Sequence, residues 1–139
     1  MAGKADLHIH TTYSDGKISP FEVLNLAVAK GLKAISITDH DTIKGYLKAE
    51  EILESEQLPI ELISGAEFTA SFKDKDIHLL GYFFDPYHKE LSEYLTACSV
   101  QRRRRMKSMI DWLNKKNIEI DFQEVQAISK HATLARPHL

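Results

Sequence analysis

Apolar and polar residues alternate with two different periods along the first half of the chain. Short apolar runs typical of strands alternate with stretches in which apolar residues recur every three or four positions, as on one face of a helix. The expected strands are 5–10, 34–38 and 60–64, the last extending toward Phe68, and the expected helices are 19–31 and 43–56. Strands and helices in this order are typical of parallel β-α-β units, whose crossovers bring the carboxyl ends of the strands to one edge.

The helix over 19–31 has sequence signals at both ends. Ser19 suits the N-cap, Pro20 the first helical position and Glu22 the third, as in a capping box. Gly31 suits the residue that closes the helix, because glycine readily adopts the left-handed conformation found there. We therefore expect capping chemistry, as well as the apolar stripe, to define this helix.

The pattern changes in the second half of the chain. The expected elements are a charged turn, a fourth strand and two helices, at 73–76, 76–84, 88–117 and 122–129 respectively. The two helices do not continue the earlier alternation of strand and helix. We expect residues 86–139 to begin a helical subdomain that is inserted in, or appended to, the α/β unit of residues 1–85.

Composition narrows the class of protein without assigning a function. The chain has 139 residues, 43% hydrophobic and 27% charged, as in an ordinary globular domain. Its net charge of −2 gives no general reason to expect binding to nucleic acid or a membrane. Cys98 is the only cysteine, so no intrachain disulfide can form, and no signal region or membrane-length apolar run is present. The cytoplasm is the expected compartment.

The sequence from Asp6 to His10 is the most informative stretch for function. Because side chains alternate along a strand, His8 and His10 share a face, and two neighbouring imidazoles form half of a metal site. Asp15 follows in a Ser-Asp-Gly turn, from which its carboxylate can reach the same pocket. A strand whose two histidines make only ordinary hydrogen bonds is the alternative.

Further polar residues lie near the other predicted strands. His40 follows the second strand, Glu67 lies near the end of the third, and His78 lies within the fourth. At the carboxyl edge of a parallel α/β barrel they would converge on the first strand. Gathering so many ionisable groups without a cation is costly, and mixed imidazole and carboxylate ligands suit zinc, iron or manganese. The candidate metal ligands are therefore His8, His10, Asp15, His40, Glu67 and His78.

Two aspartates are weaker candidates for roles at this site. Asp6 shares a face with His8 and could orient a ligand from behind it. Asp41, together with Thr42, could cap the second helix.

The long predicted helix carries arginines on its apolar face. Arg102 and Arg105 fall on the apolar stripe, where a solvated helix would not place charge. Guanidinium groups match phosphate oxygens, so we expect these side chains to reach a phosphorylated partner, with snorkelling along apolar neighbours as the alternative. Arg103 and Arg104 are expected on a solvated face. Cys98 shares the stripe and is not expected to act as a nucleophile.

Four ordered motifs resemble those of the PHP (polymerase and histidinol phosphatase) phosphoesterases, and they run from Asp6 to Gly16, Ile37 to Asp41, Gly65 to Glu67 and His78 to Tyr82. Within the family, the chain most resembles small bacterial nucleoside-monophosphate phosphatases and RNA 5′-end exonucleases. The resemblance implies an α/β fold, namely a partial, distorted (β/α)7 TIM-like barrel (the PHP fold), with residues 1–85 as its N-terminal part and residues 86–139 as the start of a helical insertion.

The resemblance also implies two or three divalent metal ions, which would be manganese, iron or zinc. The implied ligands are His8 and His10 for one ion, Asp15 and His40 for a second, and Glu67 as a bridge to a third that His78 helps to hold. Asp15, His40 and Glu67 are taken as catalytic. The expected reaction is hydrolysis of a phosphate ester of a nucleotide or short RNA by a metal-activated water.

The expected substrate-binding residues lie late in the chain, and they are Arg102, Arg105, Arg136 and His138. Arg136 resembles a phosphate contact of the family. The later ligands of the family, a histidine and an Asp-x-His motif, have no counterpart after His78. We therefore expect the N-terminal part of a longer protein, whose remaining strands and ligands are absent or supplied by another chain.

Two alternative functions stay open at this point. A metal-dependent amidohydrolase also begins with His-x-His on its first strand, although the Ser-Asp-Gly turn and the Asp-His-Asp sequence favour a phosphoesterase. A non-catalytic or polymerase-associated PHP module is the other alternative, against which the complete set of early ligands argues.

Overall fold

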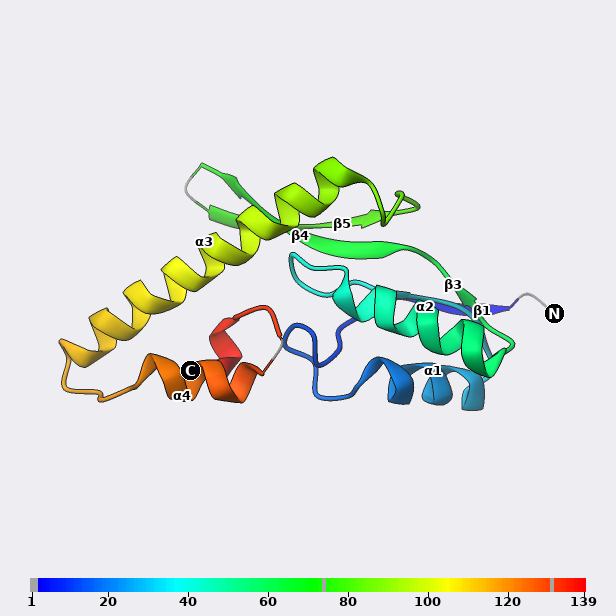
Figure 1. Ribbon diagram of the computed structural model, residues 1–139, viewed down its shortest axis with the longest axis horizontal. Helices are drawn as coiled ribbons and strands as arrows, with labels where there is room; N and C mark the ends of the chain where they lie inside the picture. Colours follow the sequence, from blue (N-terminus) through cyan, green and yellow to red (C-terminus); the bar gives the residue numbers. More distant parts are fainter. Residues whose placement is uncertain (1–2, 74, 131) are drawn as a thin grey trace.

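The structure is a computed structural model that describes residues 3–73, 75–130 and 132–139 (Figure 1). Its elements are β1 (Lys4–Ile9), α1 (Pro20–Ala29), β2 (Leu32–Ile37), α2 (Lys44–Glu56), β3 (Glu61–Leu62), β4 (Gly65–Phe72), β5 (Lys75–Tyr82), α3 (Lys89–Asn114), α4 (Phe122–Ser129) and the 3-10 helix η1 (Arg136–His138). Within these residues, no helix combines the length and the apolar character needed to span a membrane.

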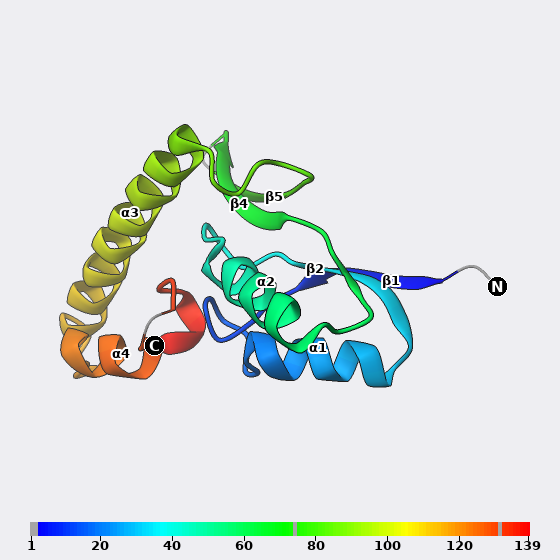
Figure 2. The same cartoon turned by 45° about the vertical axis from the view of Figure 1, so that its right-hand side comes forward.

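Three parallel strands and two helices form the first layer of the fold. β1, β2 and β3 pair in that order, and α1 and α2 pack beside each other against the sheet (Figure 1, Figure 2). The core between them is built from the side chains of Val23, Leu24, Ala27, Ile35, Ile37, Ala49 and Ile60. The predicted alternation of strand and helix is therefore present, and β2 is the central strand.

The capping signals of the first helix act as predicted. The hydroxyl of Ser19 accepts a hydrogen bond from the backbone N–H of Glu22 at 3.3 Å, and the Glu22 carboxylate accepts one from the backbone N–H of Ser19 at 2.7 Å. Gly31 follows the helix with φ at +70°, a conformation that costs glycine little. The reciprocal capping box thus starts α1 at Pro20.

The predicted third strand, over 60–64 toward Phe68, is wrong in its extent. The structure has the two-residue β3 and then a separate β4, which pairs with β5 in an antiparallel hairpin instead of extending the parallel sheet. The charged turn explains the difference: Lys73 has φ at +49°, and so short a connection can join only antiparallel neighbours. β4 keeps one link to the parallel sheet, a bridge between Glu67 and His40.

The helical part lies beside the α/β layer. α3 runs from the hairpin down to α4, and residues 132–139 return between α4 and the loop that follows β1 (Figure 2). The buried side chains of Met106, Ile110 and Val125 hold α3 and α4 together, and the backbone N–H of Thr133 donates to Tyr13 at 2.8 Å. The long helix ends at Asn114, three residues before the predicted end.

Gly45 lets helix α2 approach the loops that carry Thr11 and Asp39 closely. A β-carbon at Gly45 would collide with the Asp39 carboxylate and would lie 2.7 Å from the hydroxyl oxygen of Thr11. We expect Gly45→Ala to lower the free energy of unfolding by about 1–3 kcal/mol through overpacking, although alanine normally favours a helix. Urea denaturation measures this. The exposed Glu54→Ala in the same helix is the control and should change stability by less than about 0.5 kcal/mol; an equally harmless Gly45→Ala would contradict the prediction.

Candidate metal centre

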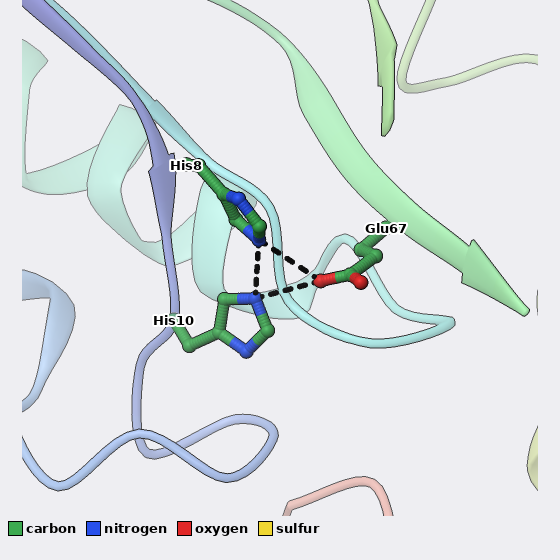
Figure 3. Close-up of side chains that lie close together, drawn as sticks. All are labelled: His8, His10 and Glu67. Atoms are coloured by element: carbon green, nitrogen blue, oxygen red, sulfur yellow. Dashed lines mark hydrogen bonds and ion pairs between the residues drawn. The ribbon is translucent and has the colours of Figure 1, made fainter. Parts of the chain in front are cut away.

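The first group of candidate ligands joins β1 to β4. His8 lies on β1, His10 directly follows it, and Glu67 lies on β4 (Figure 3). The Oε2 atom of Glu67 lies 3.1 Å from Nε2 of His8 and 2.8 Å from Nε2 of His10, and the two Nε2 atoms lie 3.2 Å apart. Three potential ligand atoms therefore face one point between the strands.

Two further groups share members with the first. Nδ1 of His10 lies 2.7 Å from Oδ1 of Asp15, and Nε2 of His40 lies 3.7 Å from the other oxygen of that carboxylate. Nδ1 of His78 lies 2.8 Å from Oε1 of Glu67. The structure thus brings all six candidate ligands together in three overlapping sets, which are His8 with His10 and Glu67, His10 with Asp15 and His40, and His40 with Glu67 and His78.

Not all of these six residues lie on strands that are arranged as the sequence predicted. β1 and β2 deliver their histidines at the carboxyl ends of parallel strands, as expected. His78 comes from within β5, where the antiparallel register places it opposite Thr69 of β4. In an antiparallel pair the residues directly opposite each other share a face, so the hairpin turns His78 toward the cluster.

Electrostatics favour the protonation states that metal ligands require. Burial alone would raise the pKa of the Asp15 and Glu67 carboxyl groups, but hydrogen bonds and charges from the surrounding histidines outweigh burial and lower both pKa values. Burial lowers the pKa of His40. Ionised carboxylates and a neutral imidazole are the ligand forms that bind a metal.

The Nδ1 atom of His40 tests whether this cluster fits a metal ion. This atom is buried and has no hydrogen-bond partner among the described residues, and Oε2 of Glu67 lies 3.7 Å from it. Buried polar atoms are nearly always paired, so an orphan among other ligands fits a cation. The donor set of imidazoles and carboxylates also fits zinc, iron or manganese.

Asp39 has a structural role that the sequence did not reveal. Its buried carboxylate accepts hydrogen bonds from the backbone and the hydroxyl of Thr11, both at 2.7 Å, and from the Ser14 hydroxyl at 2.6 Å. These bonds hold the turn that carries Asp15 against the end of β2. The hydroxyl residues before Asp15 were the available signal for such a partner.

Asp41 does not cap the second helix. Its backbone has φ at +49°, and its carboxylate accepts hydrogen bonds from the backbone N–H of Thr69 at 2.7 Å and from Nε of Arg102 at 2.6 Å. Of the predicted pair only Thr42 contacts the start of α2, through a hydrogen bond from the N–H of Lys44 at 3.2 Å. Asp41 instead ties β4 and α3 to the loop that carries His40.

Asp6 also differs from its predicted role. Its carboxylate accepts a hydrogen bond from the backbone N–H of His8 at 3.3 Å, not from the imidazole ring. It therefore steadies the strand locally, and within the described residues it makes no hydrogen bond to the imidazole that it was expected to orient.

A cavity of about 740 Å³ adjoins the cluster. Its lining includes the candidate ligands Asp15, His40 and His78. It also includes Arg102 and Arg105 of α3 and Arg136 of η1. Cys98 also lines it, but burial raises the pKa of the thiol, which keeps it protonated, as expected for a residue that is not a nucleophile.

The predicted substrate-binding residues divide into three kinds. Arg102 is held by the protein, since besides Asp41 it donates to the Thr69 hydroxyl at 2.8 Å and to the Leu134 carbonyl at 3.2 Å. Arg105 pairs with Asp76 at 2.7 Å but stays half exposed at the cavity. Arg136 lines the cavity, whereas His138 accepts a hydrogen bond from the N–H of Ala135 and is not among the lining residues of the described chain.

Known proteins with similar sequences and structures agree with this fold. The PHP domain family matches residues 6–134, so the chain belongs to the PHP domain family, as the motifs predicted. It is 34% identical over 129 residues to a 5′-3′ exoribonuclease of Haemophilus influenzae, covering 93% of this chain and 46% of that protein. It is 30% identical over 104 residues to a 3′,5′-nucleoside bisphosphate phosphatase of Chromobacterium violaceum, covering 75% of this chain and 36% of that protein.

A solved structure extends the agreement to three dimensions. A protein from Bifidobacterium adolescentis, assigned as a metal-dependent phosphoesterase, superimposes with a TM-score of 0.85 at 33% sequence identity. The match covers 99% of this chain and 48% of that one. The chain therefore spans about half the length of the relatives that it matches.

The buried pair of Asp41 and Arg102 should contribute to stability. We expect Asp41→Ala and Arg102→Ala each to lower the free energy of unfolding by about 3 kcal/mol, because each leaves a largely buried charge without its partner. The double variant should lose about 1–3 kcal/mol less than the sum of the two. Chemical denaturation of the four proteins measures this coupling.

The exposed pair of Lys89 and Glu93, on the same helix, is the matched control. Its coupling should stay below about 0.5 kcal/mol, as for other solvated pairs. Equal coupling in the two pairs would show that Asp41 does not anchor α3.

Proposed function

We propose that the protein is a metal-dependent phosphoesterase that hydrolyses a phosphate ester of a nucleotide or short RNA. One observation carries this proposal: candidate metal ligands and three arginines line the same cavity. A phosphate group needs both, because cations offset its charge and guanidinium groups donate to its oxygens. The names of the exoribonuclease and the bisphosphate phosphatase among its relatives support a nucleotide-containing substrate.

The three overlapping ligand sets would hold two or three divalent ions, with manganese, iron and zinc as the fitting elements. His8 and His10 would hold one ion, Asp15 and His40 a second, and His78 would help to hold a third. Glu67 belongs to two sets and would bridge ions. When bound, such ions lower the pKa of water and make hydroxide available near neutral pH.

The side chains of the cavity wall would bind and orient the phosphate. Arg136 has its charge at the cavity edge, and Arg105 is half exposed there. Arg102 donates three hydrogen bonds, to Asp41, Thr69 and Leu134, and these hold its guanidinium group in place. Its other N–H groups could donate to a phosphate oxygen. A guanidinium held in place in this way loses little freedom when it binds.

We also propose the wider architecture that the sequence predicted. Residues 1–85 would be the N-terminal part of a PHP barrel and residues 86–139 the start of its helical insertion. The three parallel strands and the match to about half of longer relatives support this division. Further strands and ligands would then come from additional sequence or from an associated chain, and activity assays should use the longest form of the protein.

Removal of metal should abolish hydrolysis of adenosine monophosphate and of a 5′-phosphorylated ribo-oligonucleotide, and Mn²⁺ should restore it. We expect Glu67→Gln to lower both metal affinity and kcat by about 10- to 100-fold or more, because loss of a partner of a metal ligand already costs that much. Metal analysis and phosphate release measure the two effects. His88→Ala, at the exposed start of α3, should change neither. Full activity without metal, or cleavage of cyclic amides in place of phosphate esters, would overturn the proposal.

Loss of Arg136 should weaken substrate binding more than turnover. We expect Arg136→Ala to raise KM about 10- to 100-fold, the range for removal of a charged hydrogen bond. Arg104→Ala, a matched change at an exposed position, should leave KM unchanged. Steady-state kinetics of the two variants give the KM values. Equal KM values would show that Arg136 does not bind the phosphate.

A further inference from the structure

Trp112 is a large aromatic residue that belongs neither to the core clusters nor to the lining of the cavity. It lies near the end of α3, its side chain is 61% exposed, and Nζ of Lys116 lies 5.8 Å from the centre of its ring. A large aromatic side chain normally gains free energy by burial. Trp112 instead stays mostly exposed, with a cation over its ring.

The position of Trp112 on the helix links it to the cavity. Arg105 and Met109 line the cavity, and Trp112 follows Met109 by three positions, so these residues share one face of α3. The opposite flank packs on α4, where Arg103 and Lys107 lie over the ring of Phe122. Trp112 therefore lies away from the flank that packs on α4, while Met109 lies at the border and also packs against the cluster that joins α3 to α4.

Charge on this face suits a polyanion. Arg105 stands at its cavity end and Lys116 at its far end. Between Cys98 and Trp112, the helix positions that share the face hold no aspartate or glutamate, and Asp111 is displaced by about 100° around the helix. Asp76 of β5 is the facing acid, and its carboxylate is taken up by Arg105.

The size of the cavity and its separation from Trp112 fit an RNA of more than one nucleotide. The cavity of about 740 Å³ is in the range that holds one small-molecule ligand. Trp112 lies about 10 Å along the helix axis from Arg105, at about 1.5 Å per residue. A base stacked on Trp112 would therefore belong to a nucleotide beyond the one in the cavity.

From these observations we propose that Arg105, Met109, Trp112 and Lys116 form an RNA track that binds the single strand leaving the cavity. Trp112 stacks on a base and the two cations contact the backbone, which is the combination that single-stranded nucleic acids require. The inference rests on the proposed function and selects, within it, RNA of more than one nucleotide as the substrate.

Comparing a long and a short substrate distinguishes a role in RNA binding from a general effect of the substitution on the protein. We expect Trp112→Ala to lower kcat/KM for a 5′-phosphorylated pentaribonucleotide about 5- to 100-fold, the contribution of one stacked base. Hydrolysis of adenosine monophosphate should stay unchanged, and Trp112→Phe should keep most of the activity on the oligonucleotide. Ile128→Ala, which removes an exposed apolar side chain from α4, is the control and should affect neither substrate.

An equal loss on both substrates, or no loss on either, would overturn the RNA track. If the unaltered protein hydrolyses neither substrate, the proposed function fails instead, and binding still tests the track. Trp112 is the only tryptophan of the chain, so its fluorescence reports on the track directly. The pentaribonucleotide should quench this fluorescence in a saturable manner, whereas adenosine monophosphate and inorganic phosphate should not; the absence of quenching by the oligonucleotide would reject the track.

Discussion

The buried carboxylate of Glu67 is the contact on which the centre depends. It lies within 3.1 Å of ring nitrogens of three histidines. His8 and His10 come from β1 and the residue that follows it, and His78 comes from β5. An isolated buried anion is unfavourable, so the histidines and the carboxylate stabilise one another only when β1, β4 and β5 hold them together. A bound cation would offset the same electrostatic cost, which links assembly of the fold to the chemistry of the site.

Two buried aspartates hold the segment around His40 in place and belong to none of the three ligand sets. Asp39 fastens the turn that carries Asp15, and Asp41 fastens β4 and α3. His40 lies between them in sequence and bridges to Glu67. The ligands are therefore positioned by hydrogen-bonded carboxylates on both sides of His40, and α3 is tied to the same loop through Arg102.

Local sequence signals predicted the parts of this protein that depend on local physics. The capping box around Ser19 and the bounds of α4 follow from hydrogen bonds within a few residues, and both are observed. The six ligand residues were found because alternation along β1 and the parallel crossovers are general rules. The hairpin was missed because an apolar run does not indicate which strand will pair with it. The roles of Asp39 and Asp41 were missed because their hydrogen-bond partners lie 25 or more residues away in the sequence.

The placement of His78 on an outer strand has a consequence for how the centre comes apart. β5 pairs only with β4 within the described chain, and a two-stranded ribbon is the kind of element that opens without unfolding the rest. The other five ligands belong to β4 or to the parallel layer and its loops. Fraying of the ribbon from its Phe72–Lys75 end would therefore displace His78 while the side chains of the parallel layer stay in place. The set of His40, Glu67 and His78 would then be the first of the three to come apart.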